Sequence, residues 1–326
     1  MTRRPVTGPT VWHAPDVAEP STWTLELDRA QRAELVDQAR RAASAGRTVE
    51  SLRAGDLPLR SLDPVVRAAV AALHGGRGFL LLRGFPVDEL SPAEVELGYL
   101  GLGLRVGTPV GQDKKGSLLG HVRDERVPRT GPGVRLYQTS ERQDFHTDGS
   151  DVVGLLCLHR ALSGGESRLA SAHAVYNELL RTRPDLLEVL HAPMHWDRND
   201  EQGPGEEPFF ALPPVFDVAG VPRVFYIGWY IRDAQRHAAV PRLTNAQREA
   251  MALLEATAND PRFHVEMDFQ PGDVQLLANA TVLHAREAYQ DAEEPGLRRH
   301  LLRLWLSAHD FVAVDELLRG GIPRRD

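Results

Sequence analysis

The order of the secondary-structure signals is the feature that most limits how this 326-residue chain can fold. Segments with helical composition and capping residues crowd the first third, and short apolar or alternating runs typical of strands fill the last two thirds. A parallel α/β sheet needs helices and strands that alternate, so segregated elements favour another architecture. We therefore predict an α+β protein with a mainly β core, a sandwich or barrel flanked by helices.

The predicted helices are rich in Ala, Arg, Glu and Leu and end at glycines or begin at capping residues. They span Glu26–Ala45, Asp63–Leu73 and His173–Leu190, with an interruption at Pro184, and two more open at Ser91 and Thr244. The predicted strands are short apolar or alternating runs bounded by turn residues: Gly78–Gly84, Val152–His159, Arg168–Ser171, Phe263–Phe269, Val274–Leu277, Thr281–Arg286 and Leu297–Ser307. The first 20 residues indicate an extended arm.

Two long segments have the composition of loops. Val106–Thr147 is polar and rich in glycine, and Gln202–Pro214 is dense in glycine and proline. Unstructured loops longer than about 12 residues are uncommon unless they are functional or disordered. Gly111–Thr130, which holds the only lysines, Lys114 and Lys115, and Gln202–Pro214 are therefore candidates for lids over a site, with ordinary surface loops as the alternative.

Composition excludes several classes of protein. The formal net charge of −7 argues against a nucleic-acid binder, which usually carries a basic stripe. The single cysteine, Cys157, rules out an intramolecular disulfide and a zinc cage built from cysteines. The sequence contains no run of about 18 apolar residues, so it predicts no membrane span. Its basic start lacks the apolar stretch of a signal peptide. We expect a cytoplasmic protein.

Three residue pairs have the form His-x-Asp or His-x-Glu: His146-Thr-Asp148, His195-Trp-Asp197 and His264-Val-Glu266. On a strand, both side chains of such a pair point to the same side. With a distant histidine, the pair makes the two-histidine, one-carboxylate set of non-haem Fe(II) oxygenases. However, 13 histidines and 45 acidic residues among 326 give about two such pairs by chance (13 × 45/326). The pattern alone is therefore a weak signal.

Context favours the first pair. His146 and Asp148 lie between a polar loop and an apolar strand, where a site at the mouth of a barrel belongs, and His284 follows a strand-like segment. His264 lies only 20 residues before His284, too little chain for the intervening strands of a barrel. Spacing alone does not exclude the pair at His195. We expect His146, Asp148 and His284 to hold the metal.

The last predicted strand carries two arginines on one face. Arg299 and Arg303 share that face with Leu301 and Trp305, whose apolar side chains argue for burial. A buried arginine needs an anion, and a guanidinium binds a carboxylate through two parallel hydrogen bonds. The sequence therefore indicates a site for a small dicarboxylate on this strand.

Three segments together resemble the TauD/TfdA family of 2-oxoglutarate-dependent oxygenases: QDFHTDGSDVVGLLCLHRALSGGESRLAS, NATVLHAREAYQD and RRHLLRLWLS. The ordered set of HTD, a Gly-Gly turn followed by a hydroxyl residue, a distal histidine and R-x-x-x-R is more specific than any member alone. The similarity extends from about Val66 to Asp310. It implies a distorted double-stranded β-helix, or jelly roll, flanked by helices.

The resemblance also assigns roles to residues. His146, Asp148 and His284 would bind Fe(II), Arg299 would hold the distal carboxylate of 2-oxoglutarate, and Ser167, where the family often has threonine, would assist. Arg303 matches the family's substrate-binding arginine. An acidic side chain of the protein, with Asp144, Asp151 and Glu287 near in sequence, is the alternative partner for Arg303.

The implied activity is a dioxygenase reaction that uses Fe(II), 2-oxoglutarate and dioxygen. It would hydroxylate an unactivated C–H bond of a small organic acid, amino acid or natural-product intermediate and release succinate and carbon dioxide. Residues Tyr137–Arg142 do not match those that hold the sulfonate of taurine, so taurine itself is not implied. The expected partner is a small molecule, with an anionic group as one option, and neither nucleic acid nor membrane. A homo-oligomer is left open.

No shift in composition divides the chain sharply. We expect residues 1–62 to form an arm and helix packed on the core, 63–312 the oxygenase domain and 313–326 a tail. Two alternatives to the oxygenase stay open. A metal-dependent hydrolase or lyase on the same fold would need a general base or nucleophile, and neither HExxH nor GxSxG is present. A non-catalytic jelly-roll binding protein would have no need for a complete triad.

Overall fold

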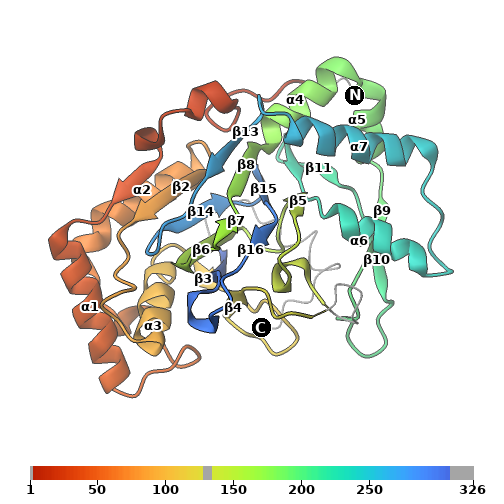
Figure 1. Ribbon diagram of the computed structural model, residues 1–326. Helices are drawn as coiled ribbons and strands as arrows, with labels where there is room; N and C mark the ends of the chain where they lie inside the picture. The colour runs from red at the N-terminus through yellow and green to blue at the C-terminus, as the bar shows by residue number, and fades with distance from the viewer. Residues whose placement is uncertain (1–2, 128–133, 309–326) are drawn as a thin grey trace.

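The computed structural model describes residues 3–127 and 134–308, so the predicted tail at 313–326 lies outside the described residues. Two sheets face each other at the centre (Figure 1). The larger has the order β1-β2-β14-β6-β17-β3, with β4 also paired to β17. Its strands are β1 (Thr24–Glu26), β2 (Phe79–Arg83), β14 (Val274–Ala278), β6 (Val152–His159), β17 (His300–Ser307), β3 (Thr108–Pro109) and β4 (Leu119–Val122).

The smaller sheet has the order β13-β8-β15-β5. Its strands are antiparallel and consist of β13 (His264–Met267), β8 (Ser167–Ser171), β15 (Val282–Arg286) and β5 (Gln143–His146). The described residues also form three two-stranded antiparallel sheets: β7 (Ser163–Gly164) with β16 (Tyr289–Gln290), β9 (Met194–Asp197) with β10 (Phe209–Leu212), and β11 (Val215–Val218) with β12 (Val221–Val224). The predicted mainly β core flanked by helices is confirmed.

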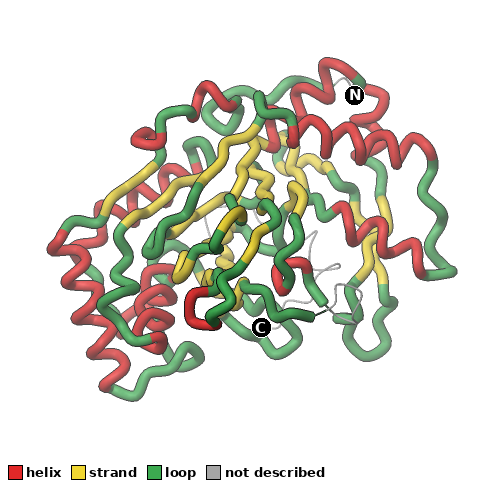
Figure 2. Tube along the Cα trace, in the orientation of Figure 1, coloured by secondary structure: helices red, strands yellow, loops and turns green. Residues whose placement is uncertain are grey.

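Helices cover the outer faces of both sheets (Figures 1 and 2). On the larger sheet lie α1 (Arg29–Ser44), α2 (Asp63–His74) and α3 (Pro92–Gly103), and on the smaller sheet α4 (Ala172–Thr182), α5 (Pro184–Leu190) and α7 (Asn245–Asn259). A short helix, α6 (Gly228–Asp233), lies beside β9. Capping boxes at Ser91 and Thr244 begin α3 and α7 as predicted. Among the described residues, no helix is both long and apolar enough to cross a membrane.

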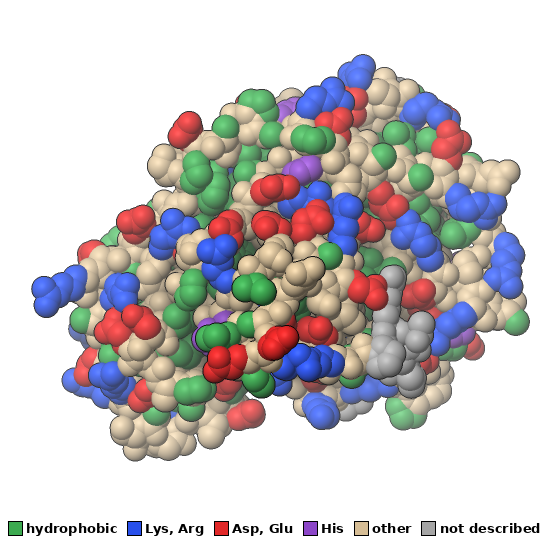
Figure 3. All heavy atoms as spheres, viewed as in Figure 1, with side chains coloured by type: hydrophobic (Ala, Val, Ile, Leu, Met, Phe, Trp, Pro, Cys, Tyr) green, Lys and Arg blue, Asp and Glu red, His purple; other side chains and the backbone are tan. Residues whose placement is uncertain are grey.

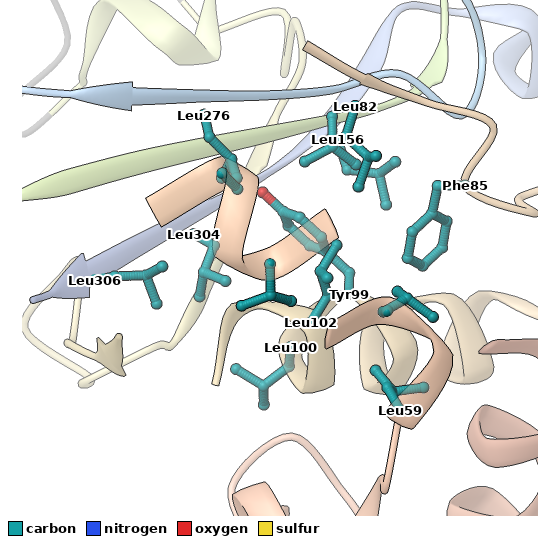
Figure 4. Close-up of a cluster of buried hydrophobic side chains, with 14 of the residues drawn as sticks. Leu59, Leu82, Phe85, Tyr99, Leu100, Leu102, Leu156, Leu276, Leu304 and Leu306 are labelled. Carbon is teal, nitrogen blue, oxygen red and sulfur yellow. The ribbon is translucent and has the colours of Figure 1, made fainter. Parts of the chain in front are cut away.

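Side chains alternate along β17 between two of the buried apolar clusters, one on each face of the larger sheet. Leu302, Leu304 and Leu306 point outward into the apolar cluster beneath α3, which Figure 4 shows around Tyr99. Leu301 and Trp305 belong to the other cluster, which is built from residues of both sheets and fills the space between them. Because side chains alternate along a strand, Arg303 shares the inward face with Leu301 and Trp305. The period of this strand therefore carries a charged side chain into the interior.

The structure departs from the sequence predictions in the irregular segments. Gln202–Pro214 contains strand β10, which pairs with β9, and the ring of Phe210 stacks on that of Trp196 with the planes 10° apart. The hairpin partner stabilises this strand, and local composition does not register it. The first 20 residues are not simply extended, because they contain 3₁₀ turns at Ala14–Val17 and from Pro20.

The surface carries mixed charges. On the face that Figure 3 shows, acidic and basic side chains are interspersed and form no continuous basic stripe. This distribution agrees with the formal net charge of −7.

Candidate metal and cosubstrate site

The three predicted metal ligands meet on the inner side of the smaller sheet. His146 ends β5, His284 lies directly opposite it on β15, and Asp148 follows β5 by two residues. One potential ligand atom from each side chain lies within 4.8 Å of the others. The Nε2 atoms of His146 and His284 each lie 3.9 Å from an oxygen of Asp148. In the described part of the chain, this is the one group of three His, Cys, Asp or Glu side chains placed to hold an ion.

Neighbouring groups fix the orientation of these ligands. Nδ1 of His146 donates to the backbone oxygen of Asp144 over 2.8 Å, so Nε2 is left to face the centre. Asn279 holds the backbone of Asp148, because its Oδ1 accepts from the Asp148 amide at 2.8 Å and its amide nitrogen donates to the Asp148 carbonyl. Nδ1 of His284 is buried and has no hydrogen-bond partner among the described residues.

Electrostatics put the triad in the protonation state that a metal requires. Burial lowers the pKa of His284 to about 3, with His146 adding to the effect, and burial also lowers the pKa of His146. Burial alone would raise the pKa of Asp148, but Arg303 and the two histidines outweigh it and bring that pKa to about 2. Near neutral pH the carboxylate is therefore charged and both imidazoles are neutral, as ligands must be. The donor set fits Fe(II).

The triad separates two cavities. The larger has a volume of about 240 Å³ and is lined by aromatic side chains, including Trp229 and Tyr230, together with charged groups. The smaller has a volume of about 40 Å³ and extends from the triad to Arg299. His146 and Asp148 border both cavities. A metal held here would be reached from two sides by two different small molecules.

The predicted cosubstrate residues both line the smaller cavity. Arg299 and Ser167 are buried, and Ser167 Oγ accepts a hydrogen bond from Gln275 at 3.0 Å. Nη1 of Arg299 has no hydrogen-bond partner among the described residues. Gly165 has a positive φ of 81°, and a Cβ there would lie 3.0 Å from Nε of Arg299. The Gly-Gly turn therefore leaves room for the guanidinium.

A second buried arginine in this cavity, Arg286, was missed by the sequence reasoning. The signal was available, because Arg286 follows His284 by two residues on β15 and so shares its face. Burial, and then the neighbouring charge of Arg299, lower its pKa to about 10, so the guanidinium stays protonated near neutral pH. The smaller cavity thus holds two cations side by side.

Arg303 has a partner that the sequence did not indicate. Its Nη1 lies 3.4 Å from Oδ2 of Asp148, its Nε donates to Oε1 of Gln112 at 2.7 Å, and its guanidinium lies between the rings of Tyr137 and Trp305. None of the three acidic residues considered from the sequence is this partner. Asp144 pairs with Arg142, Glu287 with Arg168 and Arg142, and Asp151 accepts from Ser307 and Ala308.

The two competing His-x-acid pairs have other roles. Asp197 accepts from Nε of Arg236 at 2.7 Å and contacts Nε2 of His237 at 2.8 Å, so its buried carboxylate already has two partners. Nδ1 of His264 donates to the backbone oxygen of Ala258 at 3.1 Å. Neither pair joins the cluster around His284.

The two expected lid segments meet beside the larger cavity. Residues 111–114 of the first and 203 and 206 of the second line its wall, while residues 128–130 lie outside the described residues. Lys114 donates to the backbone oxygen of Asp200, and Arg135 forms an ion pair with Glu201 while donating to the backbone oxygen of Gln112 at 2.9 Å. These contacts link the first segment, directly and through Arg135, to the two residues that precede the second segment.

Fold and site together define a jelly-roll protein with a two-histidine, one-carboxylate group placed to hold a metal ion. A family model described as "Taurine catabolism dioxygenase TauD, TfdA family" matches residues 43–305. The chain belongs to this family.

Two named proteins are similar to this chain in sequence. FR-33289 synthase from Streptomyces rubellomurinus is 34% identical over 94% of this chain and 92% of its own length. A uridine-5'-phosphate dioxygenase from an Amycolatopsis species is 28% identical over 69% of this chain and 83% of its own length.

Solved structures share the fold. An asparagine oxygenase in complex with Fe(II), 3-hydroxyasparagine and succinate superposes with a TM-score of 0.66 at 20% identity, covering 87% of this chain and 94% of that one. The non-haem iron oxygenase OrfP in complex with Fe and α-ketoglutaric acid gives 0.63 at 18% identity, with 87% and 94% covered.

The predicted class is thereby confirmed: the protein is an Fe(II)- and 2-oxoglutarate-dependent dioxygenase that uses dioxygen. The comparisons support neither the hydrolase or lyase alternative nor the non-catalytic one.

Proposed function

We propose that this dioxygenase hydroxylates an unactivated C–H bond of a small acidic molecule, with His146, Asp148 and His284 as the iron ligands. The observation that carries the proposal is the position of the triad between two cavities, one ending at buried arginines and the other walled by aromatic rings. Bound iron would activate dioxygen and couple the decarboxylation of 2-oxoglutarate to oxidation of the C–H bond.

The smaller cavity is the cosubstrate site in this proposal. Arg299 binds the distal carboxylate of 2-oxoglutarate, since a guanidinium forms charge-assisted hydrogen bonds with a carboxylate. Ser167 adds a hydroxyl donor on the same wall. The other end of 2-oxoglutarate then lies beside the triad, because His146, Asp148 and His284 border the same cavity.

The larger cavity receives the substrate. Its wall combines aromatic side chains with both basic and acidic groups, and Lys114, Arg135 and Arg303 are candidates to bind an anionic group, although Arg135 and Arg303 also pair with Glu201 and Asp148. Arg303 is the candidate nearest to the triad, and its contacts with Asp148 and Gln112 also make it a positioning residue. Uridine-5'-phosphate, in the name of a relative, is a small anionic substrate of this kind.

The test is a screen under air with Fe(II), ascorbate and 2-oxoglutarate, scored by succinate formation. Amino acids, small organic acids and nucleoside phosphates form the panel. We expect one class of compounds in the panel to give succinate and a hydroxylated product in equal amounts. The His284→Ala variant should form neither. Equal succinate formation by wild type and His284→Ala would overturn the proposal.

A further inference from the structure

The smaller cavity holds two guanidinium groups that share one aromatic neighbour. Arg286 comes from β15 and Arg299 from the residue before β17, and their guanidinium carbons lie 4.9 and 5.0 Å from the centre of the Tyr289 ring. Both side chains are buried. Arg286 donates through Nη2 to the backbone oxygen of Glu141, a contact that fixes its position without neutralising its charge.

The remaining nitrogens point to an absent ligand. Nε and Nη1 of Arg286 and Nη1 of Arg299 are buried and have no hydrogen-bond partner among the described residues. Arg168 and Arg303, which are also buried nearby, each have an acidic partner, Glu287 and Asp148, whereas neither Arg286 nor Arg299 forms an ion pair among the described residues. An arginine buried without a counter-charge is strongly unfavourable, and two adjacent cations are more so. A fold that keeps both therefore fits an anion that neutralises both.

We propose that Arg286 is a second anchor for 2-oxoglutarate and binds its distal carboxylate jointly with Arg299. This inference rests on the proposed role of the smaller cavity as the cosubstrate site. A carboxylate has about four lone-pair sites and can accept from two guanidinium groups at once. The paired cations thereby make the cavity selective for a 2-oxo diacid over a 2-oxo monoacid of equal length.

A structural role for Arg286 and a role as an anion anchor predict different changes in the melting temperature. If its bond to Glu141 mainly supports the fold, replacing Arg286 with glutamine lowers the melting temperature of the enzyme without 2-oxoglutarate. If Arg286 is an anion anchor, removing a buried charge that has no ion-pair partner among the described residues leaves that melting temperature equal or higher. The stabilisation that added 2-oxoglutarate gives should then shrink, because stabilisation by a ligand grows with the logarithm of its concentration divided by its Kd.

The experiment compares Arg286→Gln with Arg299→Gln and, as a matched control, Arg168→Gln, which removes a buried arginine that has an acidic partner. Binding of 2-oxoglutarate and of 2-oxovalerate, which lacks the distal carboxylate, is measured by calorimetry on the Fe(II)-loaded enzyme without oxygen. Melting temperature is measured with and without each acid.

For Arg286→Gln we expect the Kd of 2-oxoglutarate to rise about 10- to 100-fold while the Kd of 2-oxovalerate stays unchanged. Arg286→Lys keeps the charge and should give an intermediate Kd. Arg168→Gln should leave the Kd of 2-oxoglutarate unchanged. Unchanged 2-oxoglutarate affinity in Arg286→Gln overturns the inference if Arg299→Gln is impaired, and unchanged affinity in both overturns the cosubstrate site itself. If Arg286→Gln does not fold, wild-type affinity in Arg286→Lys and a lowered melting temperature overturn the inference.

Discussion

Trp305 donates its indole N–H to Oδ2 of Asp148 over 2.9 Å, so a residue of the larger sheet orients a proposed metal ligand that follows a strand of the smaller one. The other oxygen, Oδ1, is the one that lies 3.9 Å from Nε2 of His146. The indole therefore holds the carboxylate in one orientation between the two sheets. Hydrogen bonds of this kind orient a metal ligand and raise its affinity for the metal, although the donor does not itself bind the metal.

Replacing Trp305 with phenylalanine should weaken Fe(II) binding about 10- to 100-fold, because a smaller aromatic ring remains and the donor to Asp148 is lost. The Kd of Fe(II), measured anaerobically by titration, checks this. Trp12→Phe is the matched control, since its Nε1 donates to the backbone oxygen of Arg77 at 2.8 Å and not to a ligand. Equal iron affinity in the two variants would show that the indole does not position Asp148.

Arg303→Gln should have two effects, because Arg303 contacts Asp148 and also lines the larger cavity. We expect iron affinity to fall about tenfold and the KM for the substrate to rise, with the Kd of 2-oxoglutarate unchanged. Iron titration and steady-state kinetics with the substrate from the screen measure both. A loss of 2-oxoglutarate affinity alone would mean that Arg303 belongs to the cosubstrate site.

Arg299→Ala should weaken 2-oxoglutarate binding roughly 30-fold to several thousandfold, since losing the charge-assisted contact costs about 2–5 kcal/mol. Arg299→Lys should recover only part of the affinity, because an ammonium group does not reproduce the planar fork. Calorimetry with 2-oxoglutarate measures each Kd. Unchanged affinity in Arg299→Ala contradicts the assignment.

Removing the buried hydroxyl of Tyr99 should not lower the free energy of unfolding. This hydroxyl is buried beneath the larger sheet and has no hydrogen-bond partner among the described residues (Figure 4). Tyr99→Phe should therefore leave the free energy of unfolding unchanged or raise it by up to about 1 kcal/mol. By contrast, Tyr226→Phe loses a 2.6 Å hydrogen bond to Glu255 and should lower the free energy of unfolding by about 1–3 kcal/mol. Urea unfolding of both variants distinguishes the two situations, and a loss of stability in Tyr99→Phe would contradict this account.

Long periodic segments were predictable from the sequence because their pattern is local. β6 spans Val152–His159, as its apolar run between turn residues predicts, and β17 keeps the predicted inward face with Arg303. The triad could be chosen from three His-x-acid pairs because strand position and spacing to His284 were also visible. Its geometry in the structure agrees with that choice, and the ligand roles stay predictions.

Other features depend on contacts between distant segments. β10 forms because β9 pairs with it, and the glycines and prolines before it hide that pairing. Arg286 was missed because a lone arginine on a strand usually faces solvent. Its spacing from His284 placed it on the same strand face, and the fold adds that it is buried beside Arg299. The partner of Arg303 was missed because Asp148 lies 155 residues away and is itself one of the proposed metal ligands.

The most direct test of the central claim is the amount of Fe(II) bound per chain in wild type, His146→Ala and His195→Ala, with 2-oxoglutarate-dependent succinate formation measured on the same samples. We predict one iron per chain and full turnover in wild type and His195→Ala, and neither in His146→Ala. Retention of iron and activity by His146→Ala, with their loss in His195→Ala, would contradict the assignment of the metal centre.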